Sequence, residues 1–178
     1  MFREIFNRKE KKSSIRIAIS ALMAALVFVS TLLIRIPIPA TGGYINIGDV
    51  MIFVSALVFG PIIGGFAGGV GSAIADLIGY PSYALLTLVV KGAEGFLVGR
   101  ISNGKSKIRD TLGVIVGGVV MIVGYYLGET FIMGIGPYVA LEEVPGNSFQ
   151  ILVGGIVGLP LSLIVRRYLS PVNLVEER

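Results

Sequence analysis

Cysteine, histidine and tryptophan are all absent from this chain of 178 residues. Without cysteine or histidine, the chain cannot use disulfide bonds, thiolate nucleophiles, imidazole bases or the usual ligands of zinc and haem. Charged residues are also scarce, at 15% of the chain, whereas soluble domains contain about 25%. A soluble fold of this length needs more polar surface than this composition supplies. The chain is therefore predicted to lie in a membrane.

The remaining residues are mostly apolar and fall into segments of membrane length. Hydrophobic residues make up 54% of the chain, and the mean hydropathy is +0.85. A helix needs about 20 apolar residues to cross a bilayer. We therefore predict an all-α integral membrane protein with six transmembrane helices, formed by residues 1–178 as a single domain. The predicted helices cover residues 15–36, 47–59, 61–78, 83–101, 111–135 and 148–165, in a bundle of residues 15–170.

Two of these segments have unusual lengths. The apolar run of residues 15–36 is longer than a signal-peptide core of about 7–15 residues, so we interpret it as a retained first helix. The segment of residues 47–59 is short for a full crossing. It is predicted to be a tilted or shallow helix or part of a re-entrant hairpin, and either arrangement returns the chain to the same side.

The positions of the basic residues predict an orientation. Lysine and arginine concentrate in residues 1–14, around residues 100–109 and at the end of the last helix, whereas the other loops contain none apart from Arg35. The positive-inside rule then places both termini in the cytoplasm, including the basic N-terminus and the tail of residues 171–178. This multi-pass topology predicts a location in the plasma membrane. It also explains the net charge of +4 without a nucleic-acid partner.

Small residues recur at a spacing of four along several predicted helices. The chain has 25 glycines, and Gly64-x3-Gly68 is one example of the pattern. Small residues let helix backbones approach closely where lipid supplies no hydrophobic drive for association. We interpret the pattern as packing between helices of the same chain. Ala21 and Ala25 repeat it on the first helix, where packing is again the default interpretation.

Lys91 and Glu94 lie near the middle of an apolar segment. A single charge at the bilayer centre costs about 2.5–3.5 kcal/mol on insertion scales. Their spacing of three residues places both side chains on one face of a helix. Two interpretations remain open at this point: the residues neutralise each other as a structural pair, or they face a polar cavity that binds a ligand.

Further polar side chains map to the middle of the bilayer and to the half away from the basic loops. The other half is nearly free of polar groups, which favours a dead-end cavity open to the outside over a through-channel or a proton pathway. Asp49 and Asp76 could equally cap helices or lie at the interface. The candidate ligand-binding residues are Tyr44, Asn46, Asp49, Tyr83, Thr87, Lys91, Glu94, Tyr125, Glu129, Asn147 and Gln150.

The chemistry of this set indicates the kind of ligand. Amide, carboxylate, ammonium and phenol groups suit a small, planar, polar molecule with both hydrogen-bond donors and acceptors. No oxygen-rich cluster is closely spaced in the sequence, so we predict no metal site. No G-x4-G-K-[ST] loop occurs either, so the chain has no nucleotide-binding loop of that type.

At this point a family resemblance becomes visible in four motifs and in the alanine spacing of the first helix. Together they resemble the substrate-binding S components of energy-coupling factor (ECF) vitamin transporters, most closely the riboflavin-type branch, over residues 15–167. The motifs are Gly43-Tyr-Ile-Asn-Ile-Gly-Asp49, Phe59-Gly-Pro61, Gly68-Gly-Val-Gly-Ser-Ala-Ile-Ala-Asp76 and Lys91-Gly-Ala-Glu94-Gly95.

The resemblance implies a function and a set of partners. It implies capture of riboflavin from outside the cell with high affinity, as the transported ligand and not as a cofactor. It implies association with a transmembrane T subunit, which Ala21 and Ala25 would contact, and with two ATPase subunits. The loop of residues 37–46 would cover the site. The lack of tryptophan removes a stacking residue common in thiamine-type members and leaves tyrosine and phenylalanine to flank a flavin ring.

Other functions remain possible on the sequence alone. The chain could be an S component for another vitamin or small planar metabolite. It could be a membrane-embedded enzyme in which carboxylates and a lysine perform acid–base chemistry, although no catalytic signature appears and we expect no enzymatic activity. It could also be a small structural or channel-forming protein that oligomerises through glycine faces.

Overall fold

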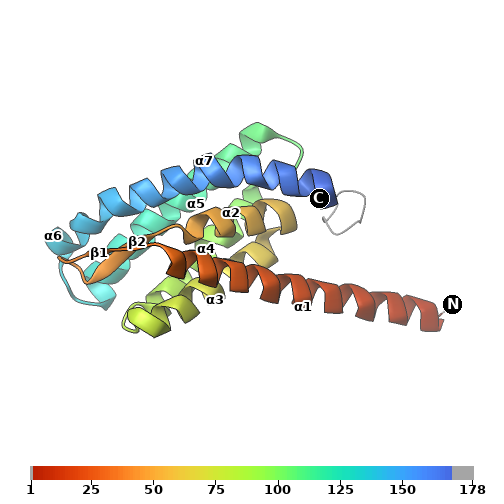
Figure 1. Ribbon diagram of the computed structural model, residues 1–178, viewed down its shortest axis with the longest axis horizontal. Coiled ribbons are helices and arrows are strands. Elements are labelled where there is room, and N and C mark those ends of the chain that lie inside the picture. Colours follow the sequence, from red (N-terminus) through yellow and green to blue (C-terminus); the bar gives the residue numbers. More distant parts are fainter. Residues whose placement is uncertain (1, 170–178) are drawn as a thin grey trace.

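The computed structural model describes the backbone of residues 2–169 and the side chains from residue 13 onward. The predicted cytoplasmic tail of residues 171–178 lies outside this range. Long helices run along one common direction, and a short hairpin lies at one end of the bundle (Figure 1). The elements are α1 (Phe2–Leu33), β1 (Arg35–Ile38), β2 (Gly43–Asn46), α2 (Gly48–Phe59), α3 (Pro61–Gly79), α4 (Ala84–Ile101), α5 (Lys107–Leu127), a π-helical turn (Gly128–Ile132), α6 (Pro137–Ala140), a 3₁₀ turn (Leu141–Glu143) and α7 (Val144–Leu169).

Each predicted helical segment is a helix in the structure, with changes at the ends. α1 begins at Phe2 instead of residue 15, because the charged residues that precede the apolar run continue the helix. It ends at Leu33 instead of residue 36. α3 begins where the sequence predicted, at Pro61, since proline suits the first turn of a helix. The predicted fifth segment is divided into α5 and a π-helical turn that carries Glu129.

The fold is not entirely helical, which corrects the prediction of a polar loop after the first helix. β1 pairs with β2 as an antiparallel hairpin in which Arg35 lies opposite Asn46. Prolines at positions 37 and 39 cannot continue α1 and hold the backbone extended. Gly42 has a φ of 72°, a left-handed conformation that glycine adopts without strain, and it turns the chain back.

The helices agree in composition with a membrane protein. Within residues 2–169, four segments are long and apolar enough to cross a bilayer: Ser13–Leu33, Pro61–Gly79, Lys107–Ile132 and Pro137–Leu169. α4 has 18 residues but contains Lys91, Glu94 and Arg100. α2, with 12 residues, is roughly 18 Å long at 1.5 Å per residue, well short of a bilayer core of about 30 Å. Six full crossings remain a prediction.

Glycines bring α3 and α4 into backbone contact, as expected for packing within one chain. A Cβ at Gly64 would lie 2.8 Å from the Gly95 carbonyl oxygen, and one at Gly68 would lie 2.6 Å from the Lys91 carbonyl oxygen. Since side chains larger than hydrogen cannot occupy these positions, the glycines set the distance between the helices. That distance places Lys91 beside α3 and inside the bundle.

Gly95→Ala is expected to destabilise the protein by about 1–3 kcal/mol, the usual cost of overpacking. Its new methyl group would overlap the backbone of Gly64, which cannot move without shifting α3. Gly92→Ala is the matched control on the same helix, because its methyl group would lie 3.6 Å from the nearest atom across the interface. Thermal unfolding of both variants in detergent checks the difference, and equal melting temperatures would contradict this packing.

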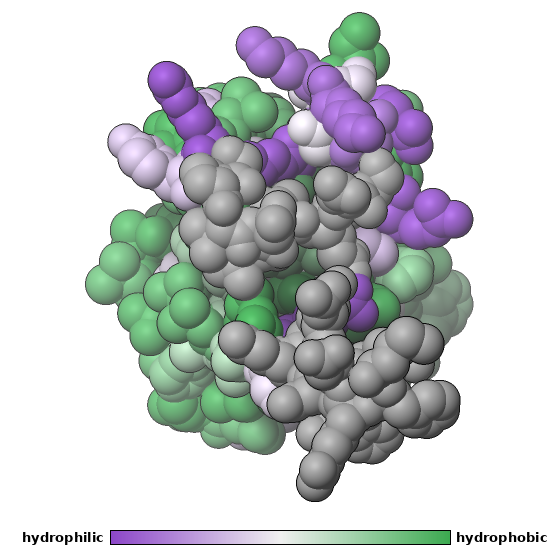
Figure 2. All heavy atoms as spheres, turned by 90° about the vertical axis from the view of Figure 1, so that its right-hand side faces the viewer, coloured by the Kyte–Doolittle hydropathy of each residue, from purple (hydrophilic) through white to green (hydrophobic). Residues whose placement is uncertain are grey.

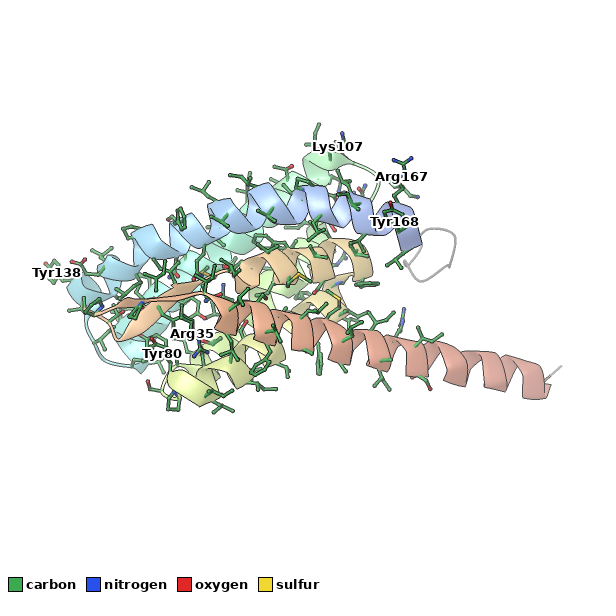
Figure 3. The ribbon with its side chains drawn as sticks, in the orientation of Figure 1. Arg35, Tyr80, Lys107, Tyr138, Arg167 and Tyr168 are labelled. Carbon is green, nitrogen blue, oxygen red and sulfur yellow. The ribbon has the colours of Figure 1, made fainter. Side chains whose placement is uncertain are left out.

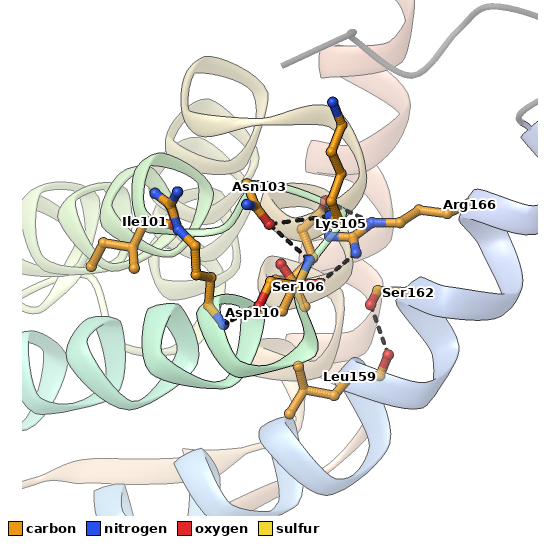
Figure 4. A network of polar contacts seen from close by, with 10 residues as sticks. Ile101, Asn103, Lys105, Ser106, Asp110, Leu159, Ser162 and Arg166 are labelled. Atoms are coloured by element: carbon orange, nitrogen blue, oxygen red, sulfur yellow. Dashed lines mark hydrogen bonds and ion pairs between the residues drawn. The ribbon is translucent and has the colours of Figure 1, made fainter.

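A polar clamp closes the opposite end of the bundle from the hairpin. Arg166 on α7 donates from Nε to the carbonyl of Leu57 at 3.0 Å and forms an ion pair with Asp110 on α5 at 2.5 Å (Figure 4). Nη2 of Arg166 donates to the same carbonyl. Asn103 and Ser106 accept backbone N–H groups and order the turn before α5. The clamp thus joins the ends of α2, α5 and α7.

The clamp end also carries exposed basic side chains. Lys107 and Arg167 lie here, whereas Tyr138 lies at the far end (Figure 3). Figure 2 views the molecule from the clamp end and shows hydrophilic side chains gathered in its upper part, with hydrophobic side chains on the left flank. Both ends of the described chain lie at this end (Figure 1). Its cytoplasmic orientation remains a prediction from the positive-inside rule.

Candidate ligand-binding cavity

A polar cavity lies at the hairpin end of the bundle. Its volume is about 20 Å³, far below the roughly 300–1,000 Å³ typical of ligand pockets, so a ligand can enter only when part of the wall moves. Residues from β2, from the 3₁₀ turn and from helices α1, α3, α4, α5 and α7 converge on it. The lining residues are Thr31, Gly43, Tyr44, Asn46, Ser72, Asp76, Tyr83, Thr87, Lys91, Tyr125, Glu143, Asn147 and Gln150.

Lys91 lines the cavity and is held by two carboxylates behind it. Its ammonium group forms ion pairs with Asp49 on α2 and, at 3.1 Å, with Glu94 one turn along α4. All three side chains are almost fully buried, with exposed fractions of 2% or less. The predicted pairing of Lys91 with Glu94 is therefore present, and Asp49 extends it to a triad. Two carboxylates and one ammonium leave an excess of negative charge when all three are ionised.

Gln150 connects this triad to the hairpin. Its side-chain nitrogen donates to the free oxygen of Asp49 at 3.1 Å, and its side-chain oxygen accepts the backbone N–H of Asn46 at the end of β2. The Asn46 side chain in turn accepts the N–H of Gly48 at 2.8 Å and supports the first turn of α2. The side chain of Asn46, and not that of Asp49, thus accepts the first N–H of α2, and the two oxygens of Asp49 accept from Lys91 and Gln150.

An aromatic cluster forms the next part of the cavity wall. The ring of Tyr44 stacks on Tyr80 with centroids 4.3 Å apart, and its hydroxyl donates to the buried carboxylate of Asp76. Burial and the neighbouring Asp76 raise the pKa of Tyr44 above its ordinary value. Its hydroxyl stays protonated and able to donate at neutral pH. Asp76 is 2% exposed, which decides against the alternative of an interfacial residue.

Arg35, the exception to the charge pattern, belongs to the same cluster. It lies close to Tyr80 (Figure 3), with its guanidinium carbon 4.8 Å from the Tyr44 ring centroid and 5.5 Å from that of Tyr80. Nη2 donates to the carbonyl of Ala75 near the end of α3 at 2.6 Å. Cation–π contacts and a helix C-terminus both stabilise a cation here. Arg35 is thus a structural part of the hairpin attachment.

Glu143 joins the hairpin turn to the 3₁₀ turn and to Tyr83, the residue before α4. The hydroxyl of Thr41 donates to Glu143, and the hydroxyl of Tyr83 donates to the carbonyl of Thr41 at 3.0 Å. Glu129 lies beside Glu143 and is fully buried. Neither of its carboxylate oxygens has a hydrogen-bond partner among the described residues.

The structure places most of the predicted site residues on the cavity wall. Tyr44, Asn46, Tyr83, Thr87, Lys91, Tyr125, Asn147 and Gln150 line it, whereas Asp49, Glu94 and Glu129 are not among the lining residues. The latter three lie in the surrounding shell. Thr87 and Tyr125 are hydrogen-bonded to each other at 2.9 Å. No prediction was made for Thr31, Ser72, Asp76 or Glu143 as binding residues.

The residues that the sequence analysis missed differ in how strong a signal the sequence gives for them. Asp76 stood out as a charge within an apolar segment, and only the degree of its burial decided between an interfacial residue and a residue of the cavity wall. Glu143 falls in a sequence that reads as a loop, and only the 3₁₀ turn brings it inward. Thr31 and Ser72 carry no signal, because isolated hydroxyl residues are common in apolar helices and often bond to their own backbone.

Comparison with known proteins identifies relatives over nearly the whole chain. The family model described as "ECF-type riboflavin transporter, S component" matches residues 11–167. A protein from Pyrococcus woesei, named "Uncharacterized protein in gap 3'region", is 48% identical over 147 residues, which are 82% of this chain and 98% of the relative. The thiamine precursor transporter HmpT of Lactococcus lactis subsp. cremoris (strain MG1363) is 28% identical, over 89% of this chain and 92% of its own.

A solved structure shares the fold. It is described as "Structure and mechanism of the S component of a bacterial ECF transporter", and it aligns with a TM-score of 0.62 at 19% sequence identity. The alignment covers 88% of this chain and 96% of the other. At this identity the likeness concerns the fold alone, which is that of a mainly helical membrane protein.

Proposed function

The chain belongs to the family of ECF-type riboflavin transporter S components, and from this premise we propose that it captures riboflavin outside the cell for ATP-driven uptake. The family consists of multi-pass substrate-binding subunits of vitamin transporters and not of enzymes. Membership therefore decides against a membrane-embedded enzyme or a structural channel. The observation that carries the ligand proposal is the tyrosine-lined polar cavity at the hairpin end, in a chain that matches the riboflavin branch.

The cavity offers the groups that riboflavin requires. The flavin ring is flat, with donors and acceptors alternating along one edge, and Tyr44, Tyr83 and Tyr125 present aromatic surface. The ribityl chain needs partners for its hydroxyl groups. Asn147 and Ser72 line the cavity, and neither has a side-chain hydrogen bond among the described residues. We propose these two as direct ligand contacts, because ligand groups can pair with them without breaking a bond within the protein.

We propose that transport depends on a T subunit and two ATPase subunits, as the family implies. Ala21 and Ala25 are exposed on one face of α1. This corrects the default interpretation, which placed them in packing within the chain. A flat surface of small residues on a lipid-facing helix suits close approach by another transmembrane helix.

Riboflavin binding is tested directly by its colour. The protein purified in detergent from cells supplied with riboflavin is expected to show flavin absorption and quenched flavin fluorescence, with a Kd below about 1 μM, equivalent to about −8.2 kcal/mol. Asn147→Leu is expected to weaken binding by roughly tenfold, the value of one hydrogen bond of about 1.4 kcal/mol. Tyr138→Ala is the control, because Tyr138 is exposed and is not among the residues that line the cavity. Absence of flavin binding would refute the ligand assignment.

A thiamine precursor is the second candidate ligand. The relative HmpT is named for it, and two acidic side chains, Asp76 and Glu143, line the cavity. Such a cavity favours a ligand rich in hydrogen-bond donors. Displacement of bound riboflavin by thiamine, its precursors and other vitamins ranks the candidates. If a precursor binds tightly and riboflavin does not, the second candidate replaces the first.

A further inference from the structure

The hairpin of residues 35–46 forms part of the cavity wall, since Gly43, Tyr44 and Asn46 are among the lining residues. For a ligand of riboflavin size to enter through this wall, the hairpin must move away from the cavity. Ile36 is 51% exposed, and both prolines are exposed. Ile38 and Ile45 lie against Gly146 of α7, and polar contacts complete the attachment of the hairpin.

Polar contacts attach the hairpin to several separate elements. Tyr44 contacts α3 through Asp76, and the turn contacts the 3₁₀ segment through Glu143. Arg35 also donates to the carbonyl of Ala75 on α3. The attachment from Asn46 to Gln150 on α7 continues into the buried charge triad.

We propose that Gln150 is a positioning residue that ties the closed position of the hairpin to the Lys91–Asp49 ion pair. The amide group of Gln150 has a fixed orientation: its oxygen accepts the N–H of Asn46, and its nitrogen donates to Asp49 at 3.1 Å. The other oxygen of Asp49 accepts from Lys91. Four groups from β2, α7, α2 and α4 thus form one continuous chain of hydrogen bonds.

This chain of hydrogen bonds fixes the orientation of the Gln150 amide, because the amide cannot flip without losing both of its contacts. An amide flip at Gln150 would turn its NH2 group toward the N–H of Asn46 and its oxygen toward the Asp49 carboxylate. Both contacts would then be repulsive, donor against donor and acceptor against acceptor. Conversely, when the hairpin leaves, Gln150 loses the partner that fixes its oxygen. The hydrogen bond from Gln150 to Asp49 is then weakened. The ion pair between Asp49 and Lys91 is weakened with it, at the time when Lys91 faces the open cavity.

The proposal rests on the proposed function in one respect only, which is that the cavity binds a ligand. Its test uses the ligand-free full chain, so failure to bind riboflavin would leave the result unaffected. Hydrogen exchange of the hairpin amides is measured by mass spectrometry in detergent. Gln150→Leu is expected to accelerate exchange across the hairpin, including the cross-strand amides that do not contact Gln150, by about two- to tenfold, the range for one lost hydrogen bond.

Asn147→Leu is the matched control, because Asn147 lies one turn earlier on α7, lines the same cavity and has no hydrogen bond to the hairpin among the described residues. Its hairpin exchange is expected to equal that of the wild type. Core amides of α3 and α5 report global stability, and they should be unchanged in both variants.

Asp49→Asn tests the second link without changing side-chain volume and remains informative if Gln150→Leu does not fold. The new NH2 group of the introduced asparagine can donate to the oxygen of Gln150 and compete with Asn46. Hairpin exchange is therefore expected to rise, although the substituted side chain itself would have no contact with the hairpin. In the double variant, the combined effect on free energy should be smaller than the sum of the two single effects.

Three results would overturn the proposal. Equal hairpin exchange in Gln150→Leu and Asn147→Leu would show that Gln150 does not hold the hairpin. Wild-type exchange in Asp49→Asn, or full additivity in the double variant, would show that the ion pair and the hairpin are independent. Faster exchange of core amides to the same degree as the hairpin would assign the effects to global destabilisation.

Discussion

Lys91→Met is expected to lower the stability of the protein by about 3–5 kcal/mol, because the substitution leaves two buried carboxylates without their cation. Asp49 and Glu94 are at most 1% exposed, so water cannot replace the ammonium group. Methionine fills nearly the same volume, and the loss therefore measures charge compensation and not packing. Thermal unfolding in detergent should show a fall in melting temperature of about 6–20 °C, at roughly 2–4 °C per kcal/mol.

The same substitution is expected to weaken ligand binding by at least tenfold, the effect of losing one charge-assisted hydrogen bond in the cavity wall. Lys105→Met is the matched control, because Lys105 is exposed at the clamp end, and surface substitutions usually change stability by less than about 0.5 kcal/mol. Adding Asp49→Asn and Glu94→Gln to Lys91→Met should recover most of the stability but not the binding. A triple variant as unstable as the single one would contradict the role of Lys91 as the shared counterion.

Ala21→Trp is expected to abolish vitamin uptake while vitamin binding stays within about twofold of the wild type, since overpacking of a tight interface costs about 1–3 kcal/mol or more. Ala21 is exposed on α1 and lies outside the residues that line the cavity. A large ring there would keep a partner helix from close approach without touching the site. Uptake of labelled riboflavin by cells that express the T and ATPase subunits measures the first effect, and equilibrium binding to the purified variant measures the second.

Leu22→Trp is the control for this prediction. Leu22 is the next residue of α1, is 59% exposed, and points about 100° away around the helix. It should tolerate the indole ring in contact with lipid. Equal loss of uptake in both variants would show that crowding anywhere on α1 interferes. Loss of binding together with uptake in Ala21→Trp would indicate misfolding instead of a blocked interface.

The helical segments followed from the sequence because hydropathy and helix-breaking residues act locally. The break at Gly60-Pro61 needs only the conformational preferences of two residues, and α3 begins there. The hairpin did not follow in the same way. Extended backbone next to prolines is also typical of a loop, and strand pairing between Arg35 and Asn46 depends on residues eleven positions apart. Local patterns do not specify such pairing, particularly where both strands have only four residues.

For the site, the sequence by itself determined which charges are costly enough to require partners. Lys91 and Glu94 needed partners wherever the helix lay, and their spacing of three residues allowed them to pair with each other. The tertiary structure alone decided that Asp49 completes the triad and that Lys91 faces the cavity while Glu94 lies behind it. The reason is that the burial of each face of a helix depends on which neighbouring helices pack against it. Here the glycines of α3 set the packing against α4. The distance between two helices cannot be read from the sequence of either helix alone.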